Sequence, residues 1–181
     1  MRLLIVDDEP IMREGLKVYI DWRNCGIESI CTAGDGVSAL EVVQSQRPDI
    51  LITDIRMPEM TGLELIEEVR KLQPDCVCLI ISGYNDFEYA KKGIEMGAFG
   101  YLVKPVSEEE LKNAAVSAAQ EAHRRIESHQ MLERYQEASG QQQRLKDREL
   151  LNELLSGEEV QMTPALEAAG ERMGISFHRS A

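Results

Sequence analysis

The sequence is poor in aromatic residues and contains no long hydrophobic run. Aromatic side chains make up 5% of its 181 residues, and one of them is a tryptophan. No apolar stretch approaches the roughly 20 residues that a membrane-spanning helix needs. The first residues, Met1-Arg2-Leu3, lead into an expected strand rather than a signal peptide. We therefore expect a cytoplasmic protein without a membrane partner.

Basic residues are scarce relative to acidic ones. The chain has 20 Lys and Arg against 32 Asp and Glu, a formal net charge of -12. Because nucleic-acid binding depends on Lys and Arg that neutralise phosphates, this chain alone should bind DNA poorly. Cysteines occur at positions 25, 31, 76 and 78, without the CxxC spacing of metal and redox motifs. We expect buried, reduced thiols.

Short apolar runs alternate with segments of helical periodicity through the first two thirds of the chain. Strands are expected at 3–6, 27–33, 50–52, 77–81 and 99–103. Helices are expected between them, at 10–22, 35–47, 62–72 and 85–96. Since crossovers between parallel strands are right-handed, the pattern predicts an α/β fold with a doubly wound, five-stranded parallel sheet.

Charged residues directly follow three of these strands. Asp7 and Asp8 follow the first strand, Asp54 follows the third and Lys104 follows the fifth. The carboxyl ends of parallel strands meet at one edge of a sheet, where ligands bind. Clustered carboxylates repel one another unless a cation neutralises them. Mg²⁺ suits this role because it binds through one or two carboxylates, waters and phosphate oxygens. The pattern predicts a phosphoryl-transfer pocket.

A long helix is expected after the fifth strand. Ser107-Glu108-Glu109-Glu110 has the pattern of a capping box, and helix-forming residues continue to about Ala138. Ser139-Gly140 predicts a kink or joint before a second, leucine-rich helix. We expect a domain at 1–120, a helical linker at 121–156 and, at 157–181, the truncated start of a following domain or a tail. Whether the linker forms a coiled coil stays open, because its apolar residues only partly fit a heptad.

Taken together, these motifs resemble the receiver domain of two-component response regulators, which has a CheY-like, flavodoxin-like fold. The resemblance covers residues 1–120 and rests on Asp7-Asp8, the segment 54–62 (Asp-Ile-Arg-Met-Pro-Glu-Met-Thr-Gly), Ser82 and Lys104-Pro105. It implies that Asp54 accepts a phosphoryl group from the histidine of a sensor histidine kinase. It also implies that the chain is a signalling protein and not an enzyme. Such a protein catalyses only its own phosphotransfer and autodephosphorylation.

The resemblance implies a magnesium site in the same pocket. Asp8 and Asp54 would ligate Mg²⁺ directly, and the main-chain carbonyl of Arg56 would be a third ligand. Asp7 would bind the metal directly or through a water molecule.

The resemblance also assigns the residues that bind phosphate and carry the switch. Lys104 would contact the phosphoryl oxygens, and its peptide bond to Pro105 is expected to be cis. Ser82 would donate its hydroxyl to the phosphate. Tyr101 matches the aromatic residue that rotates inward when this serine moves.

The output is expected to lie outside the chain. The segments 82–90 and 150–157 resemble those of regulators with an AraC-type helix-turn-helix, a domain that is absent here. We expect a homodimer on phosphorylation and regulation of transcription, with DNA bound only through the absent domain. The alternative is a protein-interaction module that acts through its helical linker without binding DNA.

Other protein classes share parts of the pattern. Phosphatases of the haloacid dehalogenase type use an aspartate and Mg²⁺, but their Asp-x-Asp motif is not met by Asp54-Ile55-Arg56. A nucleotide-binding fold would need a phosphate loop where this chain has Asp7-Asp8-Glu9. A third alternative is a receiver fold that is no longer phosphorylated and acts only as an interaction module. Failure of the chain to bind Mg²⁺ would favour it.

Overall fold

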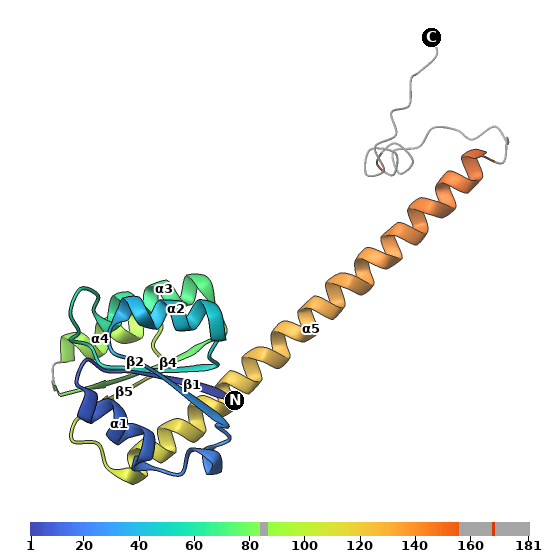
Figure 1. Ribbon diagram of the computed structural model, residues 1–181. Helices are drawn as coiled ribbons and strands as arrows, with labels where there is room; N and C mark the ends of the chain where they lie inside the picture. Colours follow the sequence, from blue (N-terminus) through green and yellow to red (C-terminus); the bar gives the residue numbers. More distant parts are fainter. Residues whose placement is uncertain (84–86, 156–167, 169–181) are drawn as a thin grey trace. The chain divides into compact units, whose positions relative to one another are not determined.

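The computed structural model describes residues 1–83, 87–155 and 168 (Figure 1). The chain divides into two compact units, Met1–Glu127 and Ser128–Ala181. The expected domain start or tail at 157–181 lies, apart from residue 168, outside the described residues.

A five-stranded sheet forms the centre of the first unit. Its strands are β1 (Arg2–Val6), β2 (Ser29–Ala33), β3 (Ile50–Thr53), β4 (Val77–Ser82) and β5 (Gly100–Val103). Their order is β2-β1-β3-β4-β5, and every neighbouring pair is parallel. This arrangement confirms the predicted fold class.

Helices cover both faces of the sheet. They are α1 (Pro10–Tyr19), α2 (Gly36–Gln46), α3 (Gly62–Leu72), α4 (Phe87–Glu95) and α5 (Glu108–Leu155), with a 3-10 helix η1 (Trp22–Cys25). In Figure 1, α1 and the beginning of α5 lie on one face, and α2, α3 and α4 lie on the other. The sheet is therefore doubly wound, as predicted.

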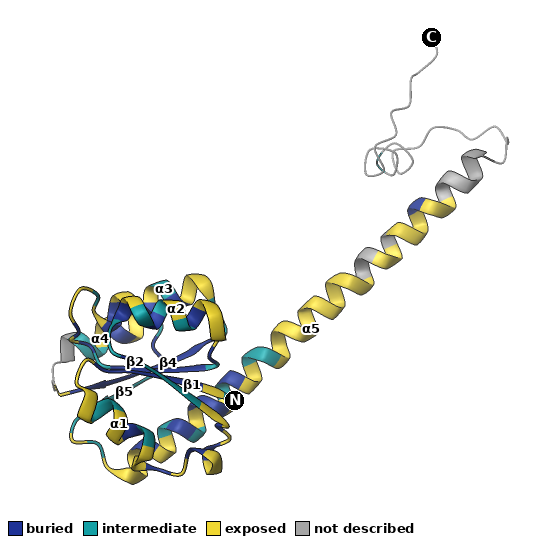
Figure 2. Ribbon diagram, in the orientation of Figure 1, coloured by how far each residue is buried: buried dark blue, intermediate teal, exposed yellow. Residues whose placement is uncertain are grey.

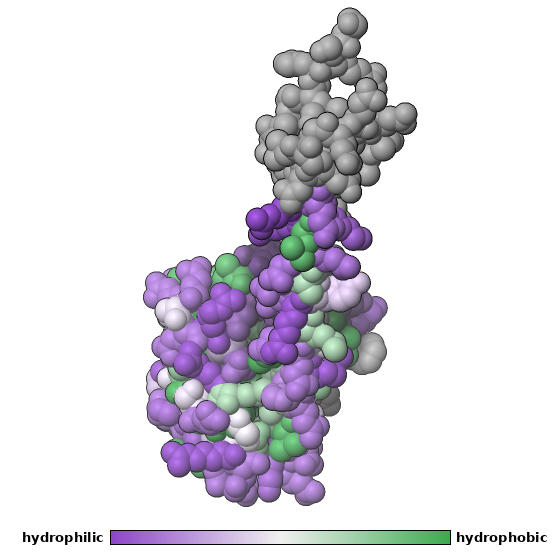
Figure 3. All heavy atoms as spheres, turned by 90° about the vertical axis from the view of Figure 1, so that its right-hand side faces the viewer, coloured by the Kyte–Doolittle hydropathy of each residue, from purple (hydrophilic) through white to green (hydrophobic). Residues whose placement is uncertain are grey.

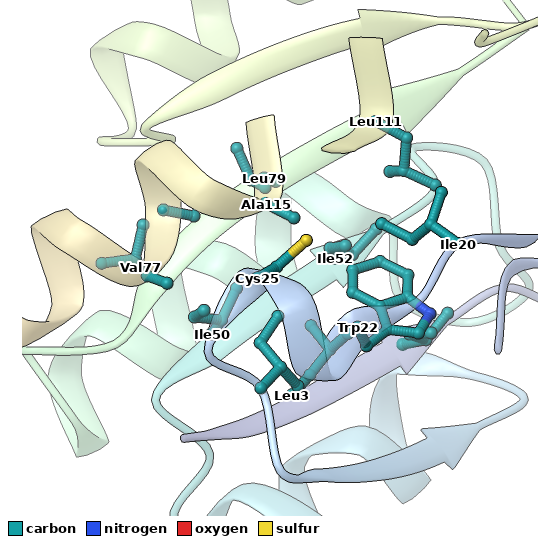
Figure 4. Close-up of a cluster of buried hydrophobic side chains, with 14 of the residues drawn as sticks. Leu3, Ile20, Trp22, Cys25, Ile50, Ile52, Val77, Leu79, Leu111 and Ala115 are labelled. Atoms are coloured by element: carbon teal, nitrogen blue, oxygen red, sulfur yellow. The ribbon is translucent and has the colours of Figure 1, made fainter. Parts of the chain in front are cut away.

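Successive residues of each strand point to opposite faces, so each strand contributes to two hydrophobic cores. Leu3 belongs to the core under α1 and α5, and Leu4 belongs to the core under α2 and α3. The inner strands β1, β3 and β4 are largely buried, the edge strands β2 and β5 are mostly half-buried, and the outer helix faces are exposed (Figure 2). The first core surrounds Trp22 (Figure 4). The Trp22 indole Nε1 donates to the Leu16 carbonyl at 3.1 Å. This core fixes the sheet whose edge carries the charged residues.

The beginning of α5 is part of this first core. Its buried positions are spaced three or four residues apart: Leu111, Ala115, Ala118 and Ala122. Alanines let the helix approach the sheet closely, and the apolar spacing in this part of α5 is explained by sheet packing. Ser107 forms the predicted capping box, since its hydroxyl accepts from Glu110 N at 3.2 Å and Glu110 Oε2 accepts from Ser107 N at 3.0 Å.

The structure differs from the prediction around the first crossover. Helix α1 ends at Tyr19 rather than near residue 22, and β2 begins at Ser29 rather than at residue 27. Between them, the Asp21 side chain accepts from Arg23 N at 3.2 Å and caps η1. Gly26 ends this turn with φ 80°, a conformation that glycine adopts at low cost.

The predicted joint at Ser139-Gly140 is wrong. Helix α5 runs without interruption from Glu108 to Leu155. One glycine in a helix costs about 1 kcal/mol relative to alanine, which good helix formers on either side offset. The side chains of the leucine-rich segment 150–155 lie outside the described residues. Earlier on α5, four large apolar side chains are exposed: Met131, Leu132, Tyr135 and Leu145.

The surface carries the excess of polar residues expected from the composition. On the face drawn in Figure 3, hydrophilic residues surround smaller hydrophobic areas. Within the described ranges, we find no helix that combines the length and apolarity required to cross a membrane. All four cysteines are free thiols; Cys25, Cys76 and Cys78 are buried and Cys31 is partly exposed.

Candidate functional site

The register of the sheet brings the predicted site residues to one edge. Val6 pairs with Thr53 and Ser82 pairs with Val103, at the carboxyl ends of their strands. Backbone hydrogen bonds continue this register by one residue, from Asp54 N to the Val6 carbonyl at 3.0 Å and from Lys104 N to the Ser82 carbonyl at 2.8 Å. Residues that are up to 97 positions apart in sequence therefore meet.

Lys104 links two of the predicted acidic residues. Its Nζ donates to Asp7 Oδ2 at 2.9 Å and to Asp54 Oδ2 at 2.6 Å. The side chains are largely withdrawn from solvent, with exposed fractions of 16% for Lys104, 2% for Asp7 and 15% for Asp54. Both contacts are charge-assisted hydrogen bonds, which are stronger than neutral ones. The structure thus places one ammonium group between two carboxylates.

The environment of Lys104 favours its charged form. Burial alone would lower its pKa, but the hydrogen bonds to Asp54 and Asp7 outweigh this effect and raise the pKa above its usual value. The ammonium group therefore stays protonated at neutral pH.

Asp7 is held through its backbone and through its side chain. Its backbone N donates to the Ala33 carbonyl at 3.4 Å, and its own carbonyl accepts from Arg13 Nη1 at 2.5 Å. Asp7 Oδ1 accepts from Glu9 N at 2.9 Å, which leaves Oδ2 for Lys104. The next residue, Asp8, is exposed at the start of the loop between β1 and α1.

Asp54 is oriented by the loop that follows it. Its Oδ1 accepts from Ile55 N at 2.5 Å and from Arg56 N at 3.3 Å, so Oδ2 points to Lys104. The loop returns tightly, with Gly62 N donating to the Ile55 carbonyl at 2.9 Å. A β-carbon at position 62 would lie 1.9 Å from the Asp54 carbonyl oxygen, so only glycine fits.

The remaining predicted site residues lie on or beside neighbouring strands. Ser82 is fully buried at the end of β4, the strand between β3 and β5. Tyr101 lies on β5, is half-buried and packs against the core under α2 and α3. Arg56 is exposed beside Asp54. The Lys104–Pro105 peptide bond is cis, as predicted.

The donor set at this edge fits a hard divalent cation. Asp7 and Asp54 each offer a carboxylate oxygen that already contacts one cationic group. Asp8 directly follows Asp7 in sequence. Across the described ranges there is no group of three His, Cys, Asp or Glu side chains arranged to hold a metal. Mg²⁺ does not need such a cage, since it binds through one or two carboxylates and keeps several waters.

Comparison with known proteins settles the family. Residues 3–116 match the model of the response regulator receiver domain. The chain belongs to this family. This receiver domain contains all the site residues described above, from Asp7 to Lys104.

Its relatives include whole regulators and isolated receiver domains. The transcriptional regulatory protein HptR of Staphylococcus aureus is 45% identical over 111 residues, which are 61% of this chain and 43% of HptR. An uncharacterized response regulatory protein of Staphylococcus epidermidis is 42% identical over 112 residues, 62% of this chain and 44% of that protein. The chain thus spans less than half the length of these curated relatives.

Two solved structures are similar in fold and sequence. A two-component transcriptional regulator AraC from Clostridium phytofermentans superposes with a TM-score of 0.66 at 38% identity, over 70% of this chain and 98% of that one. The receiver domain of the response regulator AraT from Geobacillus stearothermophilus superposes with a TM-score of 0.62 at 36% identity, over 71% of this chain and 97% of that one. The receiver domain therefore resembles those of AraC-type regulators.

Sequence reasoning missed one residue that touches the site. Arg13 contacts the Asp7 carbonyl from α1, and no motif marked it in the sequence. It also missed the capping box of α3, in which the Thr61 hydroxyl accepts from Glu64 N and Glu64 Oε2 accepts from Thr61 N. The Thr-x-x-Glu pattern at 61–64 was available in the sequence and would have revealed this cap.

Proposed function

We propose that this receiver domain accepts a phosphoryl group on Asp54 from the histidine of a sensor histidine kinase. The observation that carries the proposal is the contact of Lys104 Nζ with both Asp7 Oδ2 and Asp54 Oδ2. A fixed cation beside a carboxylate nucleophile is suited to stabilising the charge of a transferring phosphoryl group.

The transfer is a displacement at phosphorus. Asp54 Oδ2 attacks, the new P–O bond forms, and the P–N bond to the donor imidazole breaks. The imidazole leaves with the electron pair of that bond and takes up a proton. Lys104 exchanges its contact with Asp54 Oδ2 for the oxygens of the bound phosphoryl group.

Asp7, Asp8, Asp54 and the main-chain carbonyl of Arg56 would hold Mg²⁺ at this edge. The metal neutralises charge on the phosphoryl oxygens when it is bound. Asp54 is oriented for this arrangement by the Ile55 and Arg56 backbone N–H groups. Asp7 is held by the bond from its backbone N to the Ala33 carbonyl and by the bond from Glu9 N to its Oδ1.

The phosphorylation switch runs through Ser82 and Tyr101. Ser82 donates its hydroxyl to the phosphoryl group, and Tyr101 moves inward as the serine shifts. Support comes from their positions: Ser82 ends the strand between β3 and β5, and Tyr101 is half-buried on β5. The altered surface of α4, β5 and α5 then promotes homodimerisation. A coupling of about 1 to 3 kcal/mol is typical of such switches.

The signal passes to transcription through a DNA-binding domain beyond this chain. Relatives named transcriptional regulatory proteins, and a similar structure named a transcriptional regulator AraC, support this output. The layout would be a receiver at 1–120, a helical linker at 121–156 and, at 157–181, the truncated start of a following domain or a tail. We place the protein in the cytoplasm, as a signalling protein without turnover of an external substrate. The exposed apolar residues of α5, Met131, Leu132, Tyr135 and Leu145, favour as second candidate an interaction module that acts through this helix.

The proposal is tested with the whole chain, Mg²⁺ and a small-molecule phosphoryl donor. Intact mass counts the adducts, and light scattering gives the molar mass before and after the reaction. Asp54→Asn is the matched control, because asparagine preserves the shape of the side chain without its nucleophilic charge. Tyr101→Ala tests the route to association.

One adduct that is lost in Asp54→Asn, with a rise in molar mass that is lost in Tyr101→Ala, is the expected result. An adduct without a rise in molar mass would keep Asp54 as the phosphoacceptor and would reject the proposal that phosphorylation causes dimerisation. If no adduct forms, the receiver acts as an interaction module that does not use phosphorylation.

A further inference from the structure

The guanidinium group of Arg13 contacts the backbone of the turn formed by Asp7 and Asp8. This half-buried side chain donates from Nη1 to the Asp7 carbonyl at 2.5 Å. It also reaches the loop between β2 and α2, where a β-carbon at position 34 would lie 3.5 Å from the same Nη1. Arg13 therefore spans the two loops that adjoin the acidic end of β1.

The helix directs Arg13 to this place. Helical side chains tilt toward the N-terminus of their helix. Arg13 lies at the fourth position of α1, which begins at Pro10, and its backbone N donates to the Glu9 carbonyl at 3.0 Å. Its guanidinium group is thereby carried back over the start of the helix, to the turn formed by Asp7 and Asp8.

The contacted carbonyl belongs to the peptide group between Asp7 and Asp8. A peptide group is planar, so a bond to its oxygen restrains the direction in which Asp8 leaves the turn. A charge-assisted bond is roughly twice as strong as a neutral one. The other side of Asp7 is held by its N–H bond to Ala33 of β2. Arg13 completes the restraint on this turn.

We infer that Arg13 is a positioning residue that holds the Asp7–Asp8 turn in the geometry that binds a divalent cation. The inference rests on the proposed function, which assigns cation binding to this turn. The inference adds Arg13, which is not one of the acidic residues, to the cation site. It predicts whether the loss of Arg13 strengthens or weakens cation binding.

Position and charge predict opposite outcomes. If Arg13 acted only through its charge, Arg13→Gln would remove a repulsion and bind cations more tightly. If it acts by position, the same substitution releases the turn and binds them more weakly. Gly34→Leu separates the two effects, because its β-carbon would already contact Arg13 Nη1 at 3.5 Å, so the larger leucine side chain should crowd the guanidinium group while Arg13 keeps its charge. Gly34 has no left-handed backbone conformation that would forbid leucine.

The test measures Mn²⁺ binding to the full chain by the electron paramagnetic resonance of free Mn²⁺, without any phosphoryl donor. Arg13→Gln and Gly34→Leu should each raise the dissociation constant roughly tenfold or more, as loss of a positioning contact does at other metal sites. Lys17→Gln removes the same charge from the same helix and should change nothing. At saturating Mn²⁺, Arg13→Gln should regain most of the wild-type rate of phosphorylation.

Equal or tighter binding by Arg13→Gln would overturn the inference, as would wild-type binding by Gly34→Leu. Urea unfolding followed by Trp22 fluorescence shows whether each variant folds. If one variant fails to fold, the other decides the test. If the wild type itself binds no Mn²⁺, the cation part of the proposed function fails together with the inference. Binding by the wild type with no effect of Arg13→Gln rejects the inference alone.

Discussion

Removal of the Lys104 ammonium should destabilise the metal-free receiver domain. In Lys104→Met the side chain keeps its length and loses its charge, so Asp7 and Asp54 face each other without a cation. Asp7 is 2% exposed and Asp54 is 15% exposed, so water screens them poorly. The variant isolates the electrostatic work that Lys104 performs in the folded protein.

The magnitude follows from the geometry. The two carboxylate oxygens contact the same nitrogen, at 2.9 and 2.6 Å, so they cannot be farther apart than the combined lengths of these contacts. Two like charges about 5 Å apart repel by roughly 3 kcal/mol at an effective dielectric constant of about 20. Partial exposure and relaxation reduce this, and we expect a loss of about 2 kcal/mol in the free energy of unfolding.

Trp22 gives a specific assay for this loss. It is the only tryptophan of the chain, is 4% exposed and lies in the core of the receiver domain. Urea unfolding followed by its fluorescence, in a chelating buffer at neutral pH, reports the stability of this domain. The slope against urea should stay constant between variants if stability alone has changed. Lys17, a partly exposed lysine paired with Glu14 on α1, gives the matched control, and Lys17→Met should change stability by less than about 0.5 kcal/mol.

A double mutant separates charge repulsion from lost packing. Adding Asp54→Asn to Lys104→Met removes one of the two repelling charges, so the double variant should regain at least half of the loss. Mg²⁺ should also stabilise Lys104→Met more than it stabilises the wild type. A Lys104→Met variant as stable as the wild type, or a double mutant with additive losses, would refute the reasoning.

Two further predictions concern the first compact unit, Met1–Glu127. Hydrogen bonds from Arg124 and Arg125 lower the pKa of Glu121 to about 2 from its usual 4.5, so this carboxylate stabilises the fold at pH values above 4.5 and loses that contribution as the pH falls toward 2. The stability difference between the wild type and Glu121→Gln, from urea unfolding at a series of pH values, should therefore be largest at neutral pH and shrink below 4.5. Gly62→Ala should lose at least about 2 kcal/mol, because its β-carbon would meet the Asp54 carbonyl oxygen at 1.9 Å and no rotamer avoids the contact.

Matched controls accompany both. Glu14→Gln, which removes an exposed helical carboxylate that pairs with Lys17, is the control for the loss of a surface charge. Gly15→Ala is also a glycine-to-alanine change, but the added β-carbon would meet no atom of another part of the structure within 4 Å. This substitution should be neutral or stabilising. A constant difference for Glu121→Gln across the pH series, or equal effects at positions 62 and 15, would contradict these predictions.

Much of the receiver fold could be predicted because its signals are local and redundant. The bounds of α3, Gly62 to Leu72, follow from its apolar stripe, and the start of α5 follows from the capping box at Ser107. The meeting of Asp7, Asp54 and Lys104 follows from strand order, since parallel strands end at the same edge. Each of these features depends on neighbouring residues or on a general rule of topology.

Features that depend on competition between elements were not predicted. Ile20 and Trp22 are both buried, so apolar spacing could not show that α1 stops at Tyr19 and that a 3-10 helix follows. The break expected at Gly140 does not occur, because helix formers on both sides outweigh the local cost of glycine. Arg13 was missed because its role depends on the direction of its side chain in space.

The most direct test of the account is to locate the phosphoryl group on the chain. The phosphorylated protein is reduced with borohydride, which converts an aspartyl phosphate to homoserine, and the peptides are sequenced by mass spectrometry. The account predicts homoserine at position 54, formed only when Mg²⁺ and the phosphoryl donor are both present. Homoserine at position 7 or 8, or a chain that stays unmodified under these conditions, would contradict it.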